Sequence, residues 1–516
     1  MHALPYLMNM RVALLLLLLL SACDMSTPDS GGDAPIRITM LSAEGTEAPG
    51  MFGADLYRTE ALHTGLTAHA ADGRIVPALA SSWRVLDQGR TYIFRLEQAS
   101  WPDGREITAG DVVAVMRRNL APASHQPMKP YLMAIQEADA VASNRKPPRM
   151  LGVDDPRPGV VVITLDRPDP LLLSLLAHPS MAIVRKEETP PPSGPYAQGR
   201  NDGFLVANPY WFDDEEEPRQ PISLEVLPVG EAIRAFEEGR TDIVTGGSIQ
   251  GLRRSRTDAL VPALRLEQTL GLYGYLARTS GGPLTDVRIR RALAMVAGRQ
   301  ILVRDYFALD GMQPAFGPLA PTLPEAYAGA VPDWAVWSPE VRMGEARRLV
   351  QEAGYGPDRP LTLDVAIPQG DAHEEVLAWL ADDWRPLGIS LRAYKRSSEQ
   401  HRRAIESGDY DLALTERIAP AAIPEFFLEP FTCAERLGGY CNPDADSLLA
   451  EAAQQVDGAA RINLIRRAAR LIAEDAPIIP LFSPIRWSLV RPGIAGWEDN
   501  LVGAHPAHYL EFQNTQ

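Results

Sequence analysis

The chain has 516 residues, a formal net charge of −16 and a hydrophobic fraction of 46%. Single hydrophobic cores stop growing near about 250–300 residues, so we expect two or three lobes rather than one. The composition is that of a globular protein. The acidic balance disfavours nonspecific attraction to nucleic acid or to anionic lipid surfaces, which excludes nucleic acid as the partner.

The N-terminus carries an apolar run from Val12 to Leu20 after Arg11. A helix needs about 20 residues to cross a bilayer, so this run predicts an export signal rather than a membrane span. The tetrad ending in Cys23 is similar to a bacterial lipobox, which implies that Cys23 is lipidated and anchors the chain without crossing the membrane. The alternative is an ordinary cysteine near a conventional cleavage site. In enteric bacteria, an aspartate such as Asp24 after the lipidated cysteine keeps lipoproteins in the inner membrane.

Residues 1–22 are therefore a predicted signal peptide. Residues 23–35 are rich in Ser, Thr, Gly, Asp and Pro and have no apolar period, which is typical of a flexible tether. The expected location is the periplasmic side of the inner membrane.

The two remaining cysteines, Cys433 and Cys441, are close in sequence. In an exported protein such a pair predicts a local disulfide. Two free thiols are the next interpretation, and a metal site is the last, because no histidine stands at ligand spacing. We expect neither a metal nor a cofactor.

The body begins with a predicted strand at 36–40, followed by a small polar loop from Ser42 to Glu47. Loops at strand ends are where open α/β sheets bind ligands. Two hairpins then flank a helix whose start has a capping box, Thr108 with Asp111. These patterns predict a β-rich domain over residues 62–184. The hairpin strands are expected near 83–85 with 92–96, and 151–153 with 160–165.

From about residue 266, strands and helices alternate, which predicts a mostly parallel sheet covered by helices. In one of these helices, Asp371 and Glu374 are expected to cap the start. The predicted helices cover 339–353, 371–384, 444–456 and 459–474, and the predicted strands cover 361–367, 389–391 and 478–482.

Eight motifs in order resemble the family 5 extracellular solute-binding proteins, the dipeptide- and oligopeptide-binding components of ABC importers. They extend over nearly the whole mature chain. The motifs are GLTAHAADGRIVPALASSWRV, GRTYIFRLEQASWPDGREITAGDVV, SGPY, LTDVRIRRALAMVAGRQILV, EARRLVQEAGY, GDYDLAL, GGYCNPDADSLLAEA and EDAPIIPLF.

The resemblance implies an α/β fold like that of type II periplasmic binding proteins, with two lobes, a hinge and an inserted β-rich third domain. The first lobe is expected at 36–61 with 185–265 and 490–516, the inserted domain at 62–184 and the second lobe at 266–489. It also implies that the lobes close around a peptide or another small solute. The closed form then docks on an ABC permease that works with an ATPase. A monomer is the default.

The sequence departs from the pattern after the GDYDLAL strand. Peptide-binding members have a tryptophan and then an aspartate that pairs with the peptide ammonium, whereas here Arg417 and Pro420 stand at those positions. Glu416 is the nearest acid, and Arg417 in a cleft would favour an anion. Arg417 could equally be a surface arginine. The ligand-binding candidates, placed by pattern, are Glu44, Gly45, Thr46, Tyr273, Tyr275, Arg278, Glu416 and Arg417, each of which could instead be structural.

Peptide capture is the leading hypothesis. The alternatives are a non-peptide, possibly anionic solute, and a sensory or scaffold lipoprotein of the same fold that does not transport. An enzyme is not expected. The stretch from Gly246 to Gly251 matches a nucleophile elbow only loosely, and His505 and His508 are interpreted as loop residues.

Overall fold

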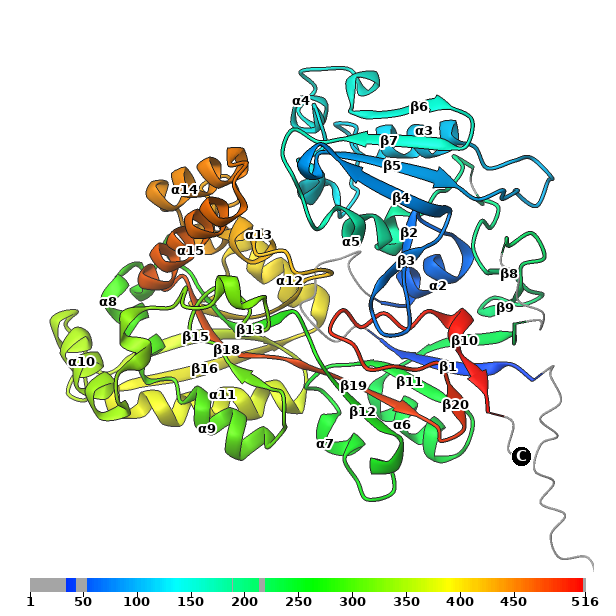
Figure 1. Cartoon of the computed structure of the whole chain (residues 1–516). Coiled ribbons are helices and arrows are strands. Elements are labelled where there is room, and N and C mark those ends of the chain that lie inside the picture. Colours follow the sequence, from blue (N-terminus) through cyan, green and yellow to red (C-terminus); the bar gives the residue numbers. More distant parts are fainter. Residues whose placement is uncertain (1–33, 43–52, 188, 213–218, 514–516) are drawn as a thin grey trace, which may run out of the picture.

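In a computed structural model of the chain, the structure describes residues 34–42, 53–187, 189–212 and 219–513. The predicted signal peptide, lipidation site and tether lie outside these residues. In the described part of the chain, no helix combines the length and hydropathy that a membrane span requires. The described body forms two lobes side by side, with a third domain above the first lobe (Figure 1).

The first lobe is built on a seven-stranded sheet with strand order β12-β19-β11-β1-β10-β9-β8. Its centre is parallel, because β1 pairs in parallel with both β10 and β11. β1 is a buried strand, IRITML, whose Ile36 and Ile38 are almost fully covered. The elements of this lobe are β1 (Ile36–Leu41), α2 (Ala54–Leu62), β8 (Tyr196–Gln198), β9 (Phe204–Ala207), β10 (Ile222–Leu227), α6 (Val229–Glu237), β11 (Ile243–Gly247), α7 (Leu252–Ser255), β12 (Leu264–Gln268), β19 (Ile485–Val490), β20 (Ile494–Ala495) and β21 (Glu511–Phe512).

The inserted domain carries a four-stranded antiparallel sheet, β4-β5-β7-β6, and a small two-stranded sheet. Both predicted hairpins are present. The predicted capping box is also present: the Thr108 Oγ1 accepts from the Asp111 N–H at 3.2 Å, and the Thr108 N–H donates to Asp111 Oδ2 at 2.8 Å. Its elements are β2 (Thr67–His69), β3 (Ile75–Pro77), β4 (Ala80–Leu86), β5 (Thr91–Leu96), α3 (Ala109–Asn119), α4 (Ala138–Ala142), β6 (Val153–Arg157), β7 (Val160–Thr164) and α5 (Leu172–Ala177).

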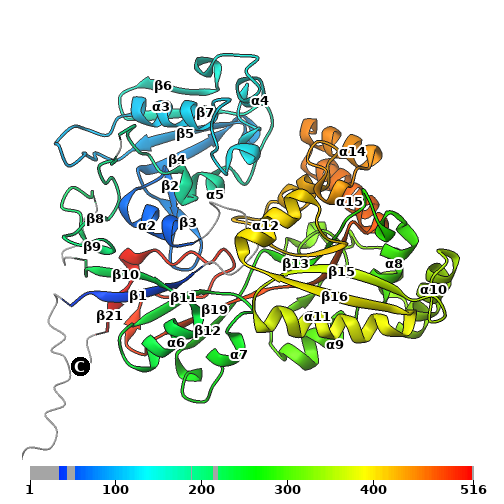
Figure 2. The same cartoon turned by 180° about the vertical axis from the view of Figure 1, so that it is seen from behind.

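The second lobe contains a six-stranded sheet, β14-β18-β13-β17-β15-β16, with helices around it (Figure 2). A pair of long helices, α14 and α15, projects from it toward the inserted domain. Its elements are β13 (Gly271–Ala277), α8 (Val287–Val296), α9 (Arg299–Ile301), β14 (Gln313–Pro314), α10 (Pro339–Glu352), β15 (Leu361–Pro368), α11 (Asp371–Trp384), β16 (Ile389–Arg396), α12 (Ser398–Ser407), β17 (Leu412–Ile418), α13 (Glu425–Leu428), α14 (Pro443–Gln454), α15 (Gly458–Asp475) and β18 (Ile478–Ser483).

The prediction of a mostly parallel sheet in the second lobe is wrong. The pairs β15–β16 and β15–β17 are parallel, but β13 pairs antiparallel with both β17 and β18, and β14 pairs antiparallel with β18. The strand-helix-strand units give the parallel pairs. β13 and β18 bring the chain into the lobe and out of it, so they run in opposite directions at the centre of the sheet.

The predicted cap by Asp371 is also absent. The helix α11 begins after Gly370, which has no side chain to cap it, and the Ala372 N–H in its first turn donates to Gln250 Oε1 of the first lobe at 3.4 Å. Asp371 is instead the first helical residue, and its carboxylate lies 3.8 Å from the Arg254 guanidinium of α7 in the first lobe. A carboxylate here still interacts favourably with the positive end of the helix dipole.

The chain crosses between the lobes twice, from β12 to β13 and from β18 to β19. The predicted boundaries at 265/266 and 489/490 fall inside β12 and β19, and both strands belong to the sheet of the first lobe. The crossings therefore lie near residues 269–270 and 484. The inserted domain has a different attachment, because the chain enters it from α2 and leaves it toward β8, two elements of the first lobe. It is covalently joined to the first lobe alone.

Candidate functional site

A cavity of about 630 Å³ lies where the first lobe, the inserted domain and the second lobe meet. It opens at the carboxyl ends of the parallel strands β1 and β11, where Leu41, Ser42 and Gly247 line it. The carboxyl ends of parallel strands are the usual ligand position in open α/β sheets. Pockets that enclose a small ligand have volumes of about 300–1,000 Å³, so this cavity has a suitable size.

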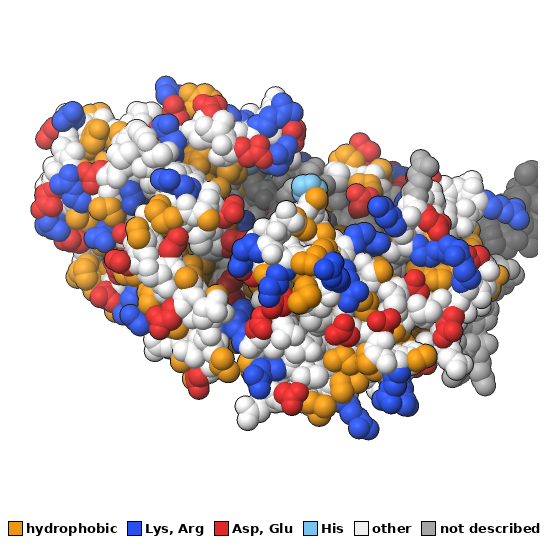
Figure 3. All heavy atoms as spheres, turned by 90° about the horizontal axis from the view of Figure 1, so that it is seen from above, with side chains coloured by type: hydrophobic (Ala, Val, Ile, Leu, Met, Phe, Trp, Pro, Cys, Tyr) orange, Lys and Arg blue, Asp and Glu red, His pale blue; other side chains and the backbone are white. Residues whose placement is uncertain are grey.

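Each part of the body contributes to the cavity wall. The inserted domain supplies His69 and His178, and the second lobe supplies Glu416, Ile418 and Pro420. From above, the surface is furrowed between the second lobe and the inserted domain, with acidic and basic side chains interspersed on both sides (Figure 3). A ligand in this cavity would contact both lobes at once.

The Glu60 carboxylate lines the cavity from the last part of α2. This helix follows β1 after the short loop predicted to bind ligand, so the fold brings it to the strand ends. Burial raises the pKa of Glu60 to about 7, because a low-dielectric environment disfavours the charged form. A cationic ligand group placed beside it would restore the charged form.

Glu416 lines the same cavity from β17 and is only 2% exposed. Ile418 points to the same face of the strand, since successive side chains alternate, and it also lines the cavity. Glu416 and Glu60 therefore bring two carboxylates from opposite lobes to one cavity. Of the predicted ligand candidates on described residues, Glu416 is the one in the cavity wall.

A buried polar cluster adjoins the cavity next to the crossing strands. His505 Nε2 lies 3.1 Å from Glu267 Oε2, the Asn500 N–H donates to Glu267 Oε1 at 2.8 Å, and Arg486 faces Glu267 across the β12–β19 pair. Burial disfavours the charged Glu267, but the His505 hydrogen bond and the Arg486 charge hold the pKa of Glu267 below its usual range. His505 also stacks on Trp497 at 3.7 Å between ring centroids. Arg486 and His505 both line the cavity.

Among the described residues, the predicted ligand candidates Tyr273, Tyr275, Arg278 and Arg417 are not in the cavity wall. Glu44, Gly45 and Thr46 lie outside the described residues. Tyr273 and Tyr275 are fully buried in the second lobe, where Tyr273 stacks on Phe482 at 4.6 Å and its hydroxyl lies 3.0 Å from His373 Nδ1. Their neighbours are those of core residues.

Arg278 follows the end of β13 that is remote from the crossing, and its guanidinium lies 3.3 Å from the Asp411 carboxylate. Arg417 belongs to the cavity strand β17 but points to the opposite face from Glu416. Its Nη2 donates to the Phe426 carbonyl at 2.8 Å, and its guanidinium lies over the Phe426 ring at 4.4 Å. Burial lowers the pKa of Arg417.

Several cavity residues were missed by reasoning from the sequence. Glu60, Arg486 and His505 reach the cavity from α2, β19 and a loop near the C-terminus, so only the tertiary structure brings them together. A signal was available for Glu60 alone, because its helix directly follows the predicted ligand loop. Ser248, from the loosely matched nucleophile elbow, also lines the cavity, and its Oγ accepts the Gln250 N–H at 3.3 Å, as in a local turn.

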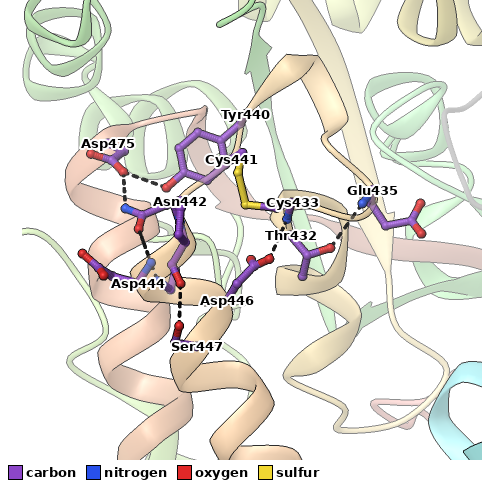
Figure 4. Close-up of a disulfide and its surroundings, with 12 residues drawn as sticks. Thr432, Cys433, Glu435, Tyr440, Cys441, Asn442, Asp444, Asp446, Ser447 and Asp475 are labelled. Atoms are coloured by element: carbon purple, nitrogen blue, oxygen red, sulfur yellow. Dashed lines mark hydrogen bonds between the residues drawn. A yellow bond between two sulfur atoms is a disulfide. The ribbon is translucent and has the colours of Figure 1, made fainter.

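Cys433 and Cys441 form a disulfide with a Cα–Cα distance of 4.5 Å (Figure 4). The Cys433 N–H donates to Asp446 Oδ2 at 2.9 Å, and Asn442 caps α14 by accepting from the first N–H groups of the helix. The bridge therefore ties the segment after α13 to the start of α14. In the described part of the chain, no three His, Cys, Asp or Glu side chains are grouped as a metal site would require.

The comparisons with known proteins agree with this architecture. The model of the bacterial extracellular solute-binding proteins, family 5, matches residues 74–438, more than half of the chain. The periplasmic oligopeptide-binding protein OppA of Escherichia coli is 26% identical over 459 residues, 84% of either chain. A probable deoxycholate-binding periplasmic protein of the same organism, YgiS, is 25% identical over 463 residues, covering 84% of this chain and 85% of its own.

A solved structure of Haemophilus influenzae OppA in complex with RPPGFSPFR superposes with a TM-score of 0.78 at 21% identity. It covers 94% of this chain and 100% of the other. This confirms the predicted α/β fold with two lobes and an inserted domain. Solute-binding proteins capture ligands without transforming them, in agreement with the expectation that the chain is not an enzyme. The extent of the family match and the shared fold show that the chain belongs to the family 5 bacterial extracellular solute-binding proteins.

Proposed function

We propose that this protein captures short peptides in the cavity between its lobes and delivers them to an ABC import permease with its ATPase. The observation that carries the proposal is the position of the cavity. Its wall includes the strand ends of the first lobe and Glu416, Ile418 and Pro420 of the second lobe. A ligand held there is released only when the lobes separate, which suits a carrier that hands its load to a channel.

Two carboxylates favour a ligand with an ammonium group. Pro420 occupies the predicted position of the ammonium-binding aspartate, and it lines the cavity together with Glu60 and Glu416. The missing acid is thus replaced by others in the same cavity. Hydrogen bonds to charged groups contribute about 1.5–3 kcal/mol each, so one such carboxylate is enough to select a free amino terminus. Arg486 supplies a cation for a second, anionic group of a peptide.

The proposal includes the location. The curated relative from Escherichia coli is named as periplasmic, and the lipobox at Cys23 would tether the chain to the membrane beside its permease. A tether raises the effective concentration of the carrier near the channel. Metabolic labelling with a radioactive fatty acid tests this: the wild-type chain should be labelled and Cys23→Ser should not. Label on both chains, or on neither, would contradict lipid anchoring through Cys23.

Isothermal titration calorimetry of the purified protein with an equimolar tripeptide library tests the ligand class. The matched control is the same library acetylated at its amino termini. We expect saturable binding of the free library and affinity lowered by about tenfold or more for the acetylated one, the loss of one charged hydrogen bond. Equal binding of both libraries would exclude recognition of the ammonium, and no binding of either would exclude tripeptides.

An amphipathic anion is the second candidate. The cavity wall includes Val226, Val229 and Ile485 as well as Arg486, and one relative is named as probably deoxycholate-binding. Titration of the protein with deoxycholate below its micellar concentration separates the two functions. Saturable binding of deoxycholate without binding of tripeptides would replace the first proposal by the second.

A further inference from the structure

The inserted domain touches the second lobe although no covalent connection joins them. The Tyr131 hydroxyl of the inserted domain donates to Glu429 Oε2 at 3.2 Å, and the Tyr131 ring lies 6.2 Å from the Phe426 ring. Nearby, Arg167 Nε donates to the Ala453 carbonyl of α14 at 2.7 Å. These contacts join parts of the chain separated by nearly 300 residues.

The contact follows the cavity wall of the second lobe along the chain. The chain that lines the cavity as Glu416, Ile418 and Pro420 continues into α13, where Phe426 lies. On the other side, His178 and Pro179 of the inserted domain line the same cavity. When the lobes separate, the inserted domain moves with the first lobe, to which both of its connections run. Contacts between it and the second lobe must then break.

Arg417 links this contact to the strand of the cavity. Its guanidinium lies over the Phe426 ring and donates to the Phe426 carbonyl, so it fixes that ring from beneath. It also lies close enough to Tyr131 and Glu429 to influence their ionisation. Arg417, one of the two departures from the peptide-binding pattern, therefore serves the contact between domains, while its neighbour Glu416 lines the cavity.

The Glu429 carboxylate is partly buried, so the contact is favourable only while Tyr131 hydrogen-bonds to it. Burial raises the pKa of Glu429, and the hydrogen bond from Tyr131 acts in the opposite direction. An acidic group in such a place is costly unless it has a partner. When the domains separate, water can hydrogen-bond to the Glu429 carboxylate in place of Tyr131. The Tyr131–Glu429 hydrogen bond can therefore form and break reversibly.

We propose that Tyr131, Phe426 and Glu429 form a closing contact that holds the inserted domain against the second lobe and retains the ligand. Arg417 is a positioning residue that fixes Phe426 for this contact and does not touch the ligand. The role of the contact in retaining the ligand rests on the proposed capture of peptides between the lobes. The existence of the contact does not depend on that proposal.

Stopped-flow tryptophan fluorescence with the tightest-binding member of the tripeptide library tests the retaining role. Tyr131→Phe should raise the dissociation rate constant by roughly three- to tenfold, the loss of one hydrogen bond, and leave the association rate constant within about twofold. Tyr210→Phe, at a tyrosine 46% exposed on the first lobe, is the matched control and should change neither rate constant.

Coupling between the residues separates a closing contact from general damage. Glu429→Gln and Arg417→Met should each raise the dissociation rate constant, and each should add little to Tyr131→Phe in a double variant, because one contact is already broken. Additive effects, or a dissociation rate constant unchanged in Tyr131→Phe, would overturn the proposal.

A second measurement decides the question if no tripeptide binds. Cysteines at the two ends, Tyr131→Cys with Glu429→Cys, should be joined by a short bis-maleimide cross-linker in much higher yield than a control pair, Tyr210→Cys with Glu429→Cys. No excess yield would refute the closing contact. An excess yield without tripeptide binding would retain the contact and reject the peptide ligand.

Discussion

Two contacts of the second lobe differ in kind: the one with the first lobe at the crossing strands, and the closing contact with the inserted domain. At the crossing, the Thr269 Oγ1 donates to the Pro484 carbonyl at 2.7 Å, and the Ser483 Oγ donates to the Thr269 carbonyl at 3.1 Å. Both side chains are at most 1% exposed. Among the described residues, the inserted domain meets the second lobe here through the Tyr131–Glu429 hydrogen bond between partly exposed side chains, the bond from Arg167 to the Ala453 carbonyl, and the Tyr131 and Phe426 rings. We expect the interface at the crossing strands to stay intact when the lobes separate, and the closing contact to break.

The largest expected effect concerns the buried core of β19, the strand that follows the second crossing. Trp487 of β19 is fully buried, and its Nε1 donates to the Gln250 carbonyl at 3.0 Å. Trp487→Ala should lower the free energy of unfolding by about 3–5 kcal/mol, the cost of an aromatic cavity. Urea unfolding measures this change. The control Trp337→Ala, at a side chain 40% exposed, should change it by much less, and equal losses would contradict the contrast.

Removal of the disulfide should give the second-largest change in the free energy of unfolding. It closes a short loop with a sequence separation of 8, so the loss of loop-closure entropy in the unfolded chain corresponds to about 2–3 kcal/mol. The variant Cys433→Ser with Cys441→Ser should lower the free energy of unfolding by that amount. Differential scanning calorimetry with and without reductant provides the check: the wild type should lose stability on reduction, and the variant should not respond.

The third effect is a dependence of binding on pH. The pKa of Glu60 is raised to about 7 by burial, against 4.5 for an ordinary glutamate. A raised carboxyl pKa means that Glu60 favours the folded state most below pH 4.5, and that this contribution declines as the pH rises through 7. Affinity for an ammonium ligand should change in the opposite sense and increase from pH 6 to pH 8, as the carboxylate forms.

Glu60→Gln is the matched variant for that prediction. Calorimetric titrations at pH 6, 7 and 8 should show its affinity to be lower than that of the wild type at pH 8 and nearly independent of pH. Among the described residues, the other acids and histidines that line the cavity are Asp55, His69, His178, Glu416 and His505, so they are the first candidates for a pH dependence that survives in Glu60→Gln.

The smallest effect compares one deleted hydroxyl in two places. Tyr273 is fully buried, and its hydroxyl lies 3.0 Å from His373 Nδ1. Tyr273→Phe should cost about 0.5–1.5 kcal/mol of unfolding free energy. Tyr131→Phe should change this free energy by less than about 0.5 kcal/mol, as at most surface positions. A loss for Tyr131→Phe as large as that for Tyr273→Phe would make Tyr131 a structural residue.

Local patterns predicted the elements well. The Thr108 capping box depends only on residues three apart, and the hairpins on alternation and a turn, so neighbours in sequence decide them. The direction of the β13 and β18 pairs could not be read in this way. It depends on where the chain enters and leaves the lobe, and that is a property of the whole fold.

The site was predicted in part for a similar reason. Glu416 could be named because it is the acid nearest to the position where the family pattern has its ammonium-binding aspartate. Arg417 illustrates the limit: one residue further along the same strand, its side chain points to the other face and meets Phe426. Glu60, Arg486 and His505 converge from three separate segments, and no spacing in the sequence records that convergence.

The central claim is that a peptide is held between the lobes, and native mass spectrometry of the purified protein tests it most directly. The bound material is identified after denaturation of the complex. We expect a ladder of short peptides with free amino termini that is depleted in Glu60→Gln. A single non-peptide compound, or an empty and stable protein that binds no member of the tripeptide library, would contradict the claim.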